Sequence, residues 1–441
     1  MARELAPAQV ADLIESGVLE INDGYRAKNS ELGRQGLPFA RGGNIDGGFH
    51  FEDADRFPEK NLDRVGEKIS RPGDAVFTSK GTVGRFAFVT EDTPRFVYSP
   101  QLCFWRSLDR DVVDPRWLFY WMHSSEFFDQ YSGVKGQTDM ADYVSLRDQR
   151  RMQITVPPIG EQRVIAEVLG SVDDKIGVNR QANRTLEAMA RAIFKAWFLD
   201  FYPVIAKSEG RPIFGVDAQT ATLFPDAFED SPLGPIPKGW GVGPILDHAE
   251  LLSGGTPKTS IPEYWGGDVP WASAADVSAS GETFLIQSDR RITERGLHES
   301  STRMIPVKAT VIVARGATTG RLCMFGAEMA MNQTCYALHS RHGLPFFLYC
   351  LCRASIEDIV HMAYGSVFDT ITTRTFGDSE VIIPAPEVAA RFEQIVTPMF
   401  DAILTNQRQS AILTKIREAL LPKLISGKIT VSRTEGIDDG G

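Results

Sequence analysis

The residues best suited to chemistry are cations beside two glycine-containing turns, one in each half of the chain. The cations are Lys80, Arg85, Arg315 and Arg321, and the glycines between them are Gly81, Gly84, Gly316 and Gly320. Glycine lets the backbone approach a ligand closely, and Lys and Arg side chains bind phosphates or the edges of bases. The turns lack the GxxxxGK[ST] spacing of a nucleotide-binding loop. They indicate phosphate or base-edge contacts, and the alternative is that they are only hairpin turns.

Polar loop segments also recur in the same order in both halves. The matched segments are 39–45 with 271–277, 98–101 with 331–334, and 136–139 with 365–369. Asn, Gln, Ser, Thr and Arg are the side chains that distinguish bases in the major groove, although they also occur in ordinary polar turns. Together with the turn cations they give a set of candidate nucleic-acid contacts. These are Arg41, Asn44, Lys80, Thr82, Arg85, Gln101, Gln137, Thr138, Lys258, Ser273, Arg315, Thr318, Thr319, Arg321, Asn332, Gln333 and Ser366.

No arrangement of residues in the chain predicts catalysis or metal binding. The seven histidines are scattered, without an HExxH motif, and neither a GxSxG elbow nor a GxGxxG fingerprint occurs. Cys350 and Cys352 lie in an apolar segment and are interpreted as core. The acidic pair Asp173-Asp174 is expected to be solvated or to form a docking surface. The sequence therefore predicts a binding protein without a catalytic site.

The elements that must position these residues include two long helices that repeat each other. Residues 157–198 and 384–425 align without a gap at a constant offset (384 − 157 = 227). Each carries residues spaced alternately by four and three, the pattern of a coiled-coil seam. The first seam is Ile165, Leu169, Val172, Ile176, Asn179, Asn183, Leu186, Ala190, Ile193 and Trp197. The second is Phe392, Val396, Met399, Ile403, Asn406, Ser410, Leu413, Arg417, Leu420 and Leu424.

These seams predict that the two helices pair as an antiparallel coiled coil. About 38 residues at about 1.5 Å per residue give a rod of roughly 55–60 Å. Polar residues fall at the same places in both seams, where they would fix register. The alternative is that each helix only covers its own domain.

The predicted fold class is α+β, with two β-rich domains, each followed by a long helix, in a pseudo-twofold repeat. The predicted boundaries are 1–156 for the first domain, 157–200 for its helix, 201–240 for a Pro-rich linker, 241–383 for the second domain, 384–428 for its helix, and 429–441 for a disordered tail. Apolar strands ending at Pro157 and Pro384 lead into the helices, because proline closes a strand.

Composition limits the class of protein. The 441 residues suffice for two domains, and no run of about 18 apolar residues predicts a membrane span. Five scattered cysteines and the absence of a secretory signal favour a reducing cytoplasm. The net charge of −10 excludes a uniformly basic surface and leaves room for local basic patches.

At this point the residues resemble a known family. The segment 165–200 is similar to the central conserved region of specificity subunits of type I restriction-modification systems. Residues 264–271 (YWGGDVPW) and 234–240 (GPIPKGW) resemble the start of the target recognition domains of these subunits. The first half lacks such a start and has residues 14–25 in its place. The first domain is therefore expected to begin differently and to read a different half-site.

The resemblance implies a non-catalytic subunit that directs a multisubunit type I restriction endonuclease and adenine methyltransferase to double-stranded DNA. Each recognition domain would bind one half of a bipartite target, and the helices would set the spacer and dock two methyltransferase subunits. Motor and nuclease subunits would join them. No cofactor is expected in this chain, because S-adenosylmethionine, Mg and ATP would bind partner subunits. Two other hypotheses are a coiled-coil scaffold that binds only proteins and a self-contained nuclease with an unrecognised site.

Overall fold

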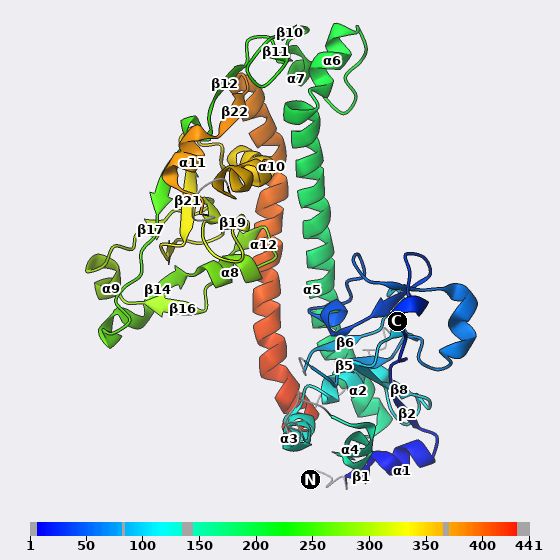
Figure 1. Ribbon diagram of the computed structural model, residues 1–441. Coiled ribbons are helices and arrows are strands. Elements are labelled where there is room, and N and C mark those ends of the chain that lie inside the picture. The colour runs from blue at the N-terminus through cyan, green and yellow to red at the C-terminus, as the bar shows by residue number, and fades with distance from the viewer. Residues whose placement is uncertain (1–6, 82–83, 135–143, 365–369, 430–441) are drawn as a thin grey trace, which may run out of the picture. The chain divides into compact units, whose positions relative to one another are not determined.

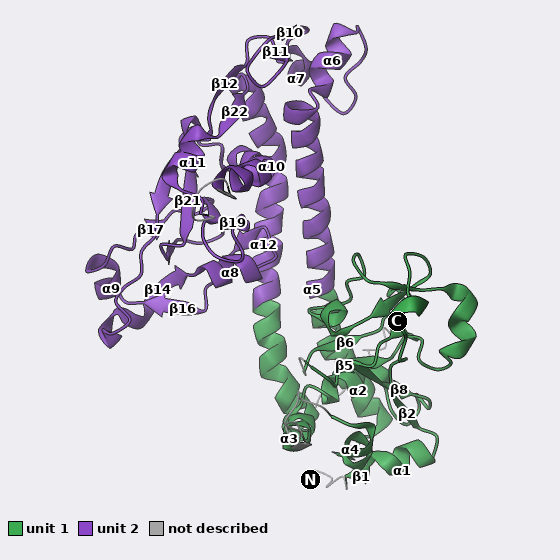
Figure 2. Cartoon of the chain, viewed as in Figure 1, with its two compact units in different colours: residues 1–175, 412–441 green, residues 176–411 purple. Residues whose placement is uncertain are grey.

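The computed structural model describes residues 7–81, 84–134, 144–364 and 370–429 (Figure 1). The chain divides into two compact units (Figure 2). The first unit comprises Met1–Lys175 and Ile412–Gly441, and the second comprises Ile176–Ala411. The long helices α5 (Ile159–Phe194) and α12 (Pro386–Ile425) each contribute residues to both units.

The first unit is built on two small sheets. Strands β2 (Leu19–Asp23), β8 (Leu102–Ser107), β5 (Ala75–Thr78) and β6 (Phe86–Phe88) form an antiparallel sheet in that order. A second sheet has the order β4 (Arg56–Phe57), β3 (Leu37–Ala40), β7 (Val97–Tyr98), and its β3–β7 pair is parallel. The remaining elements are β1 (Ala8–Gln9), α1 (Val10–Glu15), α2 (Pro115–Trp121), α3 (Ser125–Val134), α4 (Leu146–Arg151) and β9 (Gln153–Ile154).

The second unit repeats this plan. One sheet has the order β13 (Ala249–Ser253), β21 (Cys335–Ser340), β18 (Thr310–Val313), β19 (Leu322–Phe325), β15 (Phe284–Leu285). The other has the order β16 (Arg290–Ile292), β14 (Trp265–Ala272), β20 (Met329–Met331), β17 (Met304–Ile305), with a parallel β14–β20 pair. The remaining elements are α6 (Tyr202–Ser208), α7 (Ala218–Thr222), β10 (Phe228–Glu229), β11 (Ile236–Pro237), β12 (Gly241–Pro244), α8 (Ala274–Ala279), α9 (Glu294–His298), α10 (Pro345–Tyr364), α11 (Thr373–Asp378) and β22 (Glu380–Ile383).

Strand register confirms the predicted correspondence of the polar loop segments. Ala40 pairs with Tyr98 across the parallel strands of the first unit, and Ala272 pairs with Met331 in the second. These are the same partners that the sequence alignment matches. Both predicted hairpins are present as well, β5–β6 and β18–β19, and all four turn glycines have positive φ. The α+β class and the internal repeat are therefore both present.

Aromatic side chains dominate the core of the first unit. Trp105, Trp117 and Trp121 are fully buried there beside α5 residues such as Leu169. In the second unit, Phe194 of α5 and Phe392 of α12 belong to one buried cluster with Phe347 of α10. Segment 201–240 packs on this cluster through Val204, Phe224 and Ile236.

The two long helices contact each other along their predicted seams in the second unit. Asn179 Nδ2 donates to Gln409 Oε1 at 2.9 Å and Ser410 Oγ at 3.2 Å, and Asn406 Nδ2 donates to Asn183 Oδ1 at 2.9 Å. Further along α5, Phe194 contacts Phe392, with ring centroids 5.6 Å apart. Because partner numbers fall as α5 numbers rise, the helices run antiparallel in this unit. All twenty seam positions are buried or half-buried.

One expectation for α5 was wrong. Asp173 is half-buried rather than fully solvated, and its carboxylate accepts hydrogen bonds from Tyr120 Oη and Arg417 Nη1, both at 2.7 Å. The neighbouring Asp174 is exposed and pairs with Arg116. The two acidic residues therefore differ: Asp173 bonds to neighbouring elements of the first unit, and Asp174 forms an ion pair at the surface.

Candidate nucleic-acid interface

Three segments that carry predicted contacts meet at one edge of the first unit. Parallel strands β3 and β7 end side by side, and Ser99 N donates to Ala40 O at 2.9 Å just beyond them. Gly42 N donates to Gln101 Oε1 at 3.0 Å, and Ser79 N donates to Gln101 O at 3.0 Å. The loops after β3 and β7 and the β5–β6 turn therefore form one cluster.

Some predicted contact residues hold this cluster together. The side chain of Asn44 accepts from Arg41 N at 2.8 Å and donates to His50 O at 3.0 Å, which closes the loop after β3. The Arg85 guanidinium donates to Gly42 O at 3.1 Å and pairs with Asp46 at 3.0 Å. Contact of Asn44 and Arg85 with nucleic acid stays a prediction. The structure shows that both side chains shape the loop after β3.

Cationic side chains border a hollow beside these loops. The hollow has a volume of about 480 Å³, and Arg41, Lys80 and Gln101 line it together with Phe39. Arg41 lies over the Phe39 ring at 5.5 Å and pairs with Asp55 at 2.7 Å. Lys80 is exposed. The arrangement offers cationic groups, an amide and an aromatic ring to a ligand, which suits contacts with phosphates and bases.

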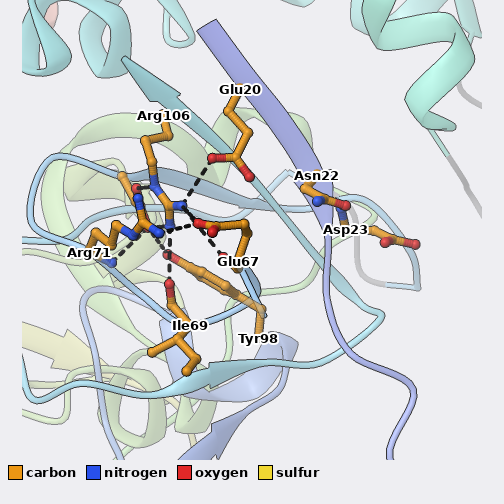
Figure 3. A network of polar contacts seen from close by, with 9 residues as sticks. Glu20, Asn22, Asp23, Glu67, Ile69, Arg71, Tyr98 and Arg106 are labelled. Carbon is orange, nitrogen blue, oxygen red and sulfur yellow. Dashed lines mark hydrogen bonds and ion pairs between the residues drawn. The ribbon is translucent and has the colours of Figure 1, made fainter. Parts of the chain in front are cut away.

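A buried polar network fixes the strand that leads into this cluster (Figure 3). Arg106 of β8 donates to Asp74 through Nε at 2.7 Å and Nη2 at 2.8 Å, and to Ile69 O at 3.0 Å. Tyr98 Oη, at the end of β7, donates to Asp74 at 2.7 Å. Burial, and then the Asp74 charge, raise the pKa of the Tyr98 hydroxyl well above its usual value.

Sequence reasoning missed this network. Its signal was an arginine that directly follows the apolar run 102–105, since a buried Arg needs a charged partner. Glu20 of β2 supplies a second carboxylate to Arg106 at 3.1 Å, so the network joins β2, β8 and β7. By holding Tyr98 in place, the network also positions the loop after β7, which carries Gln101.

The second unit assembles the matching segments in the same way. Asn332 N donates to Ala272 O at 3.0 Å, the counterpart of the Ser99–Ala40 bond. Ser278 Oγ and Thr318 Oγ1 are 2.8 Å apart, which brings the β18–β19 turn to α8. Gln333 accepts a short hydrogen bond from Thr256. Here too the loops after the parallel strands and the hairpin turn form one cluster.

Three predicted residues of this cluster serve local structure. Ser273 caps α8, because its Oγ accepts from Asp276 N while its backbone N–H donates to Asp276 Oδ2 at 2.7 Å. Thr319 Oγ1 donates to Gly316 O at 2.7 Å within the turn. Asn332 Oδ1 accepts from Thr334 Oγ1 at 2.8 Å. These side chains shape the loops that carry their neighbours.

Not all predicted residues join the clusters. Arg321 lines a separate hollow of about 550 Å³ with Arg191 of α5, Lys195 just after α5 and Arg353 of α10. Arg315 and Lys258 are exposed on the second unit. Four predicted contacts lie outside the described residues: Thr82, Gln137, Thr138 and Ser366.

Two glycines at matching positions were also missed by sequence reasoning. A side-chain carbon on Gly24 would lie 2.0 Å from Ser99 O, and one on Gly254 would lie 2.2 Å from Asn332 O. Each glycine follows the first strand of its sheet and packs on the loop after the parallel strands. A glycine recurring just after that strand in both halves was the available signal.

The described residues contain no group of three or more His, Cys, Asp or Glu side chains that could hold a metal ion. All five cysteines are free and buried. Burial raises the pKa of the Cys323, Cys335 and Cys352 thiols to about 12, so these thiols are protonated at neutral pH and poor nucleophiles. Among the helices described, none is long and apolar enough to cross a membrane.

Comparison with known proteins agrees with this geometry. A family model described as "Type I restriction modification DNA specificity domain" matches residues 16–188 and 237–416. The chain is 26% identical over 414 residues to the type I restriction enzyme HindI specificity subunit of Haemophilus influenzae, covering 84% of this chain and 89% of that protein. It is 24% identical over 380 residues to the MjaIX specificity subunit of Methanocaldococcus jannaschii, covering 85% and 81%.

A solved structure shares the fold. It is that of the type I restriction-modification S subunit from M. genitalium, which superposes with a TM-score of 0.58 at 13% identity and covers 98% of both chains.

Proposed function

Since the chain belongs to the type I restriction-modification DNA specificity family, we propose that it selects a bipartite DNA sequence, with the β-rich part of each unit binding one half. The observation that supports this most directly is the repetition of one loop cluster in both units. In each, the loops after a parallel strand pair are joined by a matching backbone hydrogen bond, Ser99–Ala40 or Asn332–Ala272. Two loop clusters that share a backbone arrangement and differ in side chains suit two different half-sites.

Affinity and specificity would come from different contacts. Exposed cations such as Lys80 and Arg315 would bind phosphates, which makes affinity dependent on salt. Loop side chains such as Gln101 and Gln333 would contact base edges, each worth roughly 1–3 kcal/mol of discrimination. Loops fixed by internal hydrogen bonds lose little entropy on binding.

We further propose that the chain is non-catalytic and works with partner subunits in the cytoplasm. Two methyltransferase subunits and the motor and nuclease subunits would supply the chemistry, and S-adenosylmethionine, Mg and ATP would bind to them. Exposed apolar side chains on the long helices support docking of partners: Val178 and Met189 in the second unit, and Ile412 and Ile416 in the first. The helices would also set the spacer between the half-sites. The free cysteines support a reducing compartment.

The test is to map methylated adenines in cells that express this chain with its methyltransferase subunit. The proposal predicts a split motif that disappears when this chain is deleted and the methyltransferase is retained. Cells with the methyltransferase alone are the control. Absence of chain-dependent methylation, with both proteins present and folded, would contradict the proposal and favour a protein-binding scaffold.

A further inference from the structure

Arg290, the first residue of β16, lies over two aromatic rings that form a platform in the second unit. Its guanidinium carbon is 3.7 Å from the centre of the Trp265 ring and 5.3 Å from that of Trp271. The residue is exposed, and within the described part of the chain no carboxylate or carbonyl accepts a hydrogen bond from its guanidinium. The cation–π contacts hold the guanidinium against the rings while its N–H donors stay available.

The platform adjoins the loop cluster of this unit. Arg290 pairs with Trp271 across β16 and β14, one residue before the end of β14 at Ala272. Asp289 N donates to Asp276 Oδ1 at 2.9 Å, and Asp276 also closes the α8 cap with Ser273. Strand β16 is an edge strand of its sheet. Arg290 therefore presents N–H donors, held by the two rings, beside the loops proposed to bind DNA.

The same position carries the opposite charge in the first unit. Register matches Pro270–Arg291 of the second unit with Pro38–Arg56 of the first. The next residue of β3, Phe39, corresponds to Trp271, which pairs with Arg290. Phe39 N donates to Asp55 O at 2.7 Å, so Asp55 occupies the position of Arg290 in the first unit.

The neighbouring position is arginine in both units. Arg56 donates to Phe51 O at 3.3 Å, and Arg291 donates to Asp268 O at 3.0 Å. One position therefore keeps an arginine tied to the backbone, and the adjacent position changes from Asp55 to Arg290. A position that changes charge between two copies of one binding cluster is where two half-sites would be distinguished.

We propose that Arg290 determines specificity in the second half-site by donating two hydrogen bonds to O6 and N7 of a guanine. This inference rests on the proposed function. A bidentate contact from arginine to guanine is the commonest base-specific contact in the major groove. The guanidinium is already held by two aromatic rings, so it loses little freedom when it binds.

The test is the methylation motif made by the full complex carrying Arg290→Ala or Arg290→Lys. Both variants should relax one guanine position of the second half-site by on the order of tenfold or more, and the first half-site should stay unchanged. Lysine keeps the charge and loses the bidentate geometry, so it separates base recognition from phosphate attraction. Arg291→Ala is the matched control and should leave both half-sites unchanged.

Three results would overturn the inference. They are an unchanged motif in Arg290→Ala, full specificity in Arg290→Lys, and a wild-type second half-site without any G·C pair. Unchanged recognition at the other positions of the second half-site in each variant shows that the second unit is folded. A wild-type complex that makes no chain-dependent motif would instead overturn the proposed function, and the inference with it.

Discussion

Removal of Asp74 should destabilise the first unit and leave the second unit intact. Asp74 is fully buried and accepts hydrogen bonds from Tyr98, from two nitrogens of Arg106 and from Arg71 N. In Asp74→Ala, the buried Arg106 keeps its contacts with Glu20, with the more exposed Glu67, with backbone oxygens and with the Phe104 ring. Breaking a buried ion pair from one side costs about 3–5 kcal/mol, and these remaining partners favour the lower end.

The expected loss of about 3 kcal/mol corresponds to a fall of about 6–12 °C in the unfolding temperature of a unit of this size. Hydrogen exchange measured by mass spectrometry can assign the loss to segments. Peptides from β5, β7 and β8 should exchange faster, and peptides from β18, β20 and β21 should not change. The first half-site should be recognised less well than the second.

A triple variant provides the control. The second unit has Ala309, Met331 and His339 at the positions of Asp74, Tyr98 and Arg106. Asp74→Ala/Tyr98→Met/Arg106→His should recover much of the loss, because no buried guanidinium is left without its partner. A loss below about 1 kcal/mol in Asp74→Ala, or a triple variant less stable than the single one, would refute the reasoning.

Three other predictions concern single side chains. Lys80→Ala should reduce the slope of log affinity against log salt by about 1 with the motif unchanged, and an unchanged slope in a binding titration would contradict a phosphate contact. Burial holds the pKa of His123 below its ordinary 6.5, so the free energy of unfolding should fall as pH drops through 6.5. In His123→Phe this pH-dependent part of the stability should be lost, which urea unfolding at pH 5.5 and 7.5 measures. An equal pH effect in both proteins would exclude His123 as its source. Gly24→Ala and Gly254→Ala should each impair recognition of their own half-site by about 1–3 kcal/mol, because the new carbon would meet a backbone oxygen. Gly33→Ala, with open space around Gly33, is the control. Normal methylation by both Gly24→Ala and Gly254→Ala would contradict the packing argument.

The sequence predicted the parts of this protein that depend on local spacing. The four-and-three spacing of residues 165–197 and 392–424 predicted both long helices and the polar seam contacts of Asn179 and Asn406, because residues on one helix face are fixed by helical geometry alone. Alignment of the two halves also predicted which loops correspond, since Ala40–Tyr98 and Ala272–Met331 are paired strand residues. The domain boundaries and the contacts with DNA stay predictions.

Tertiary structure alone decided what each polar side chain does. Arg85 and Ser273 had the right residue types for DNA contacts. The structure shows that Arg85 holds the loop after β3 and that Ser273 caps α8. Arg290 had no motif around it, and its place on Trp265 follows from the pairing of β14 with β16. The roles of Arg85 and Arg290 depend on contacts between residues far apart in the chain, as does the bond between Gly42 and Gln101, which are 59 positions apart. Residue type and local spacing determine what a side chain can bind, and the long-range pairing of strands determines which partner it meets.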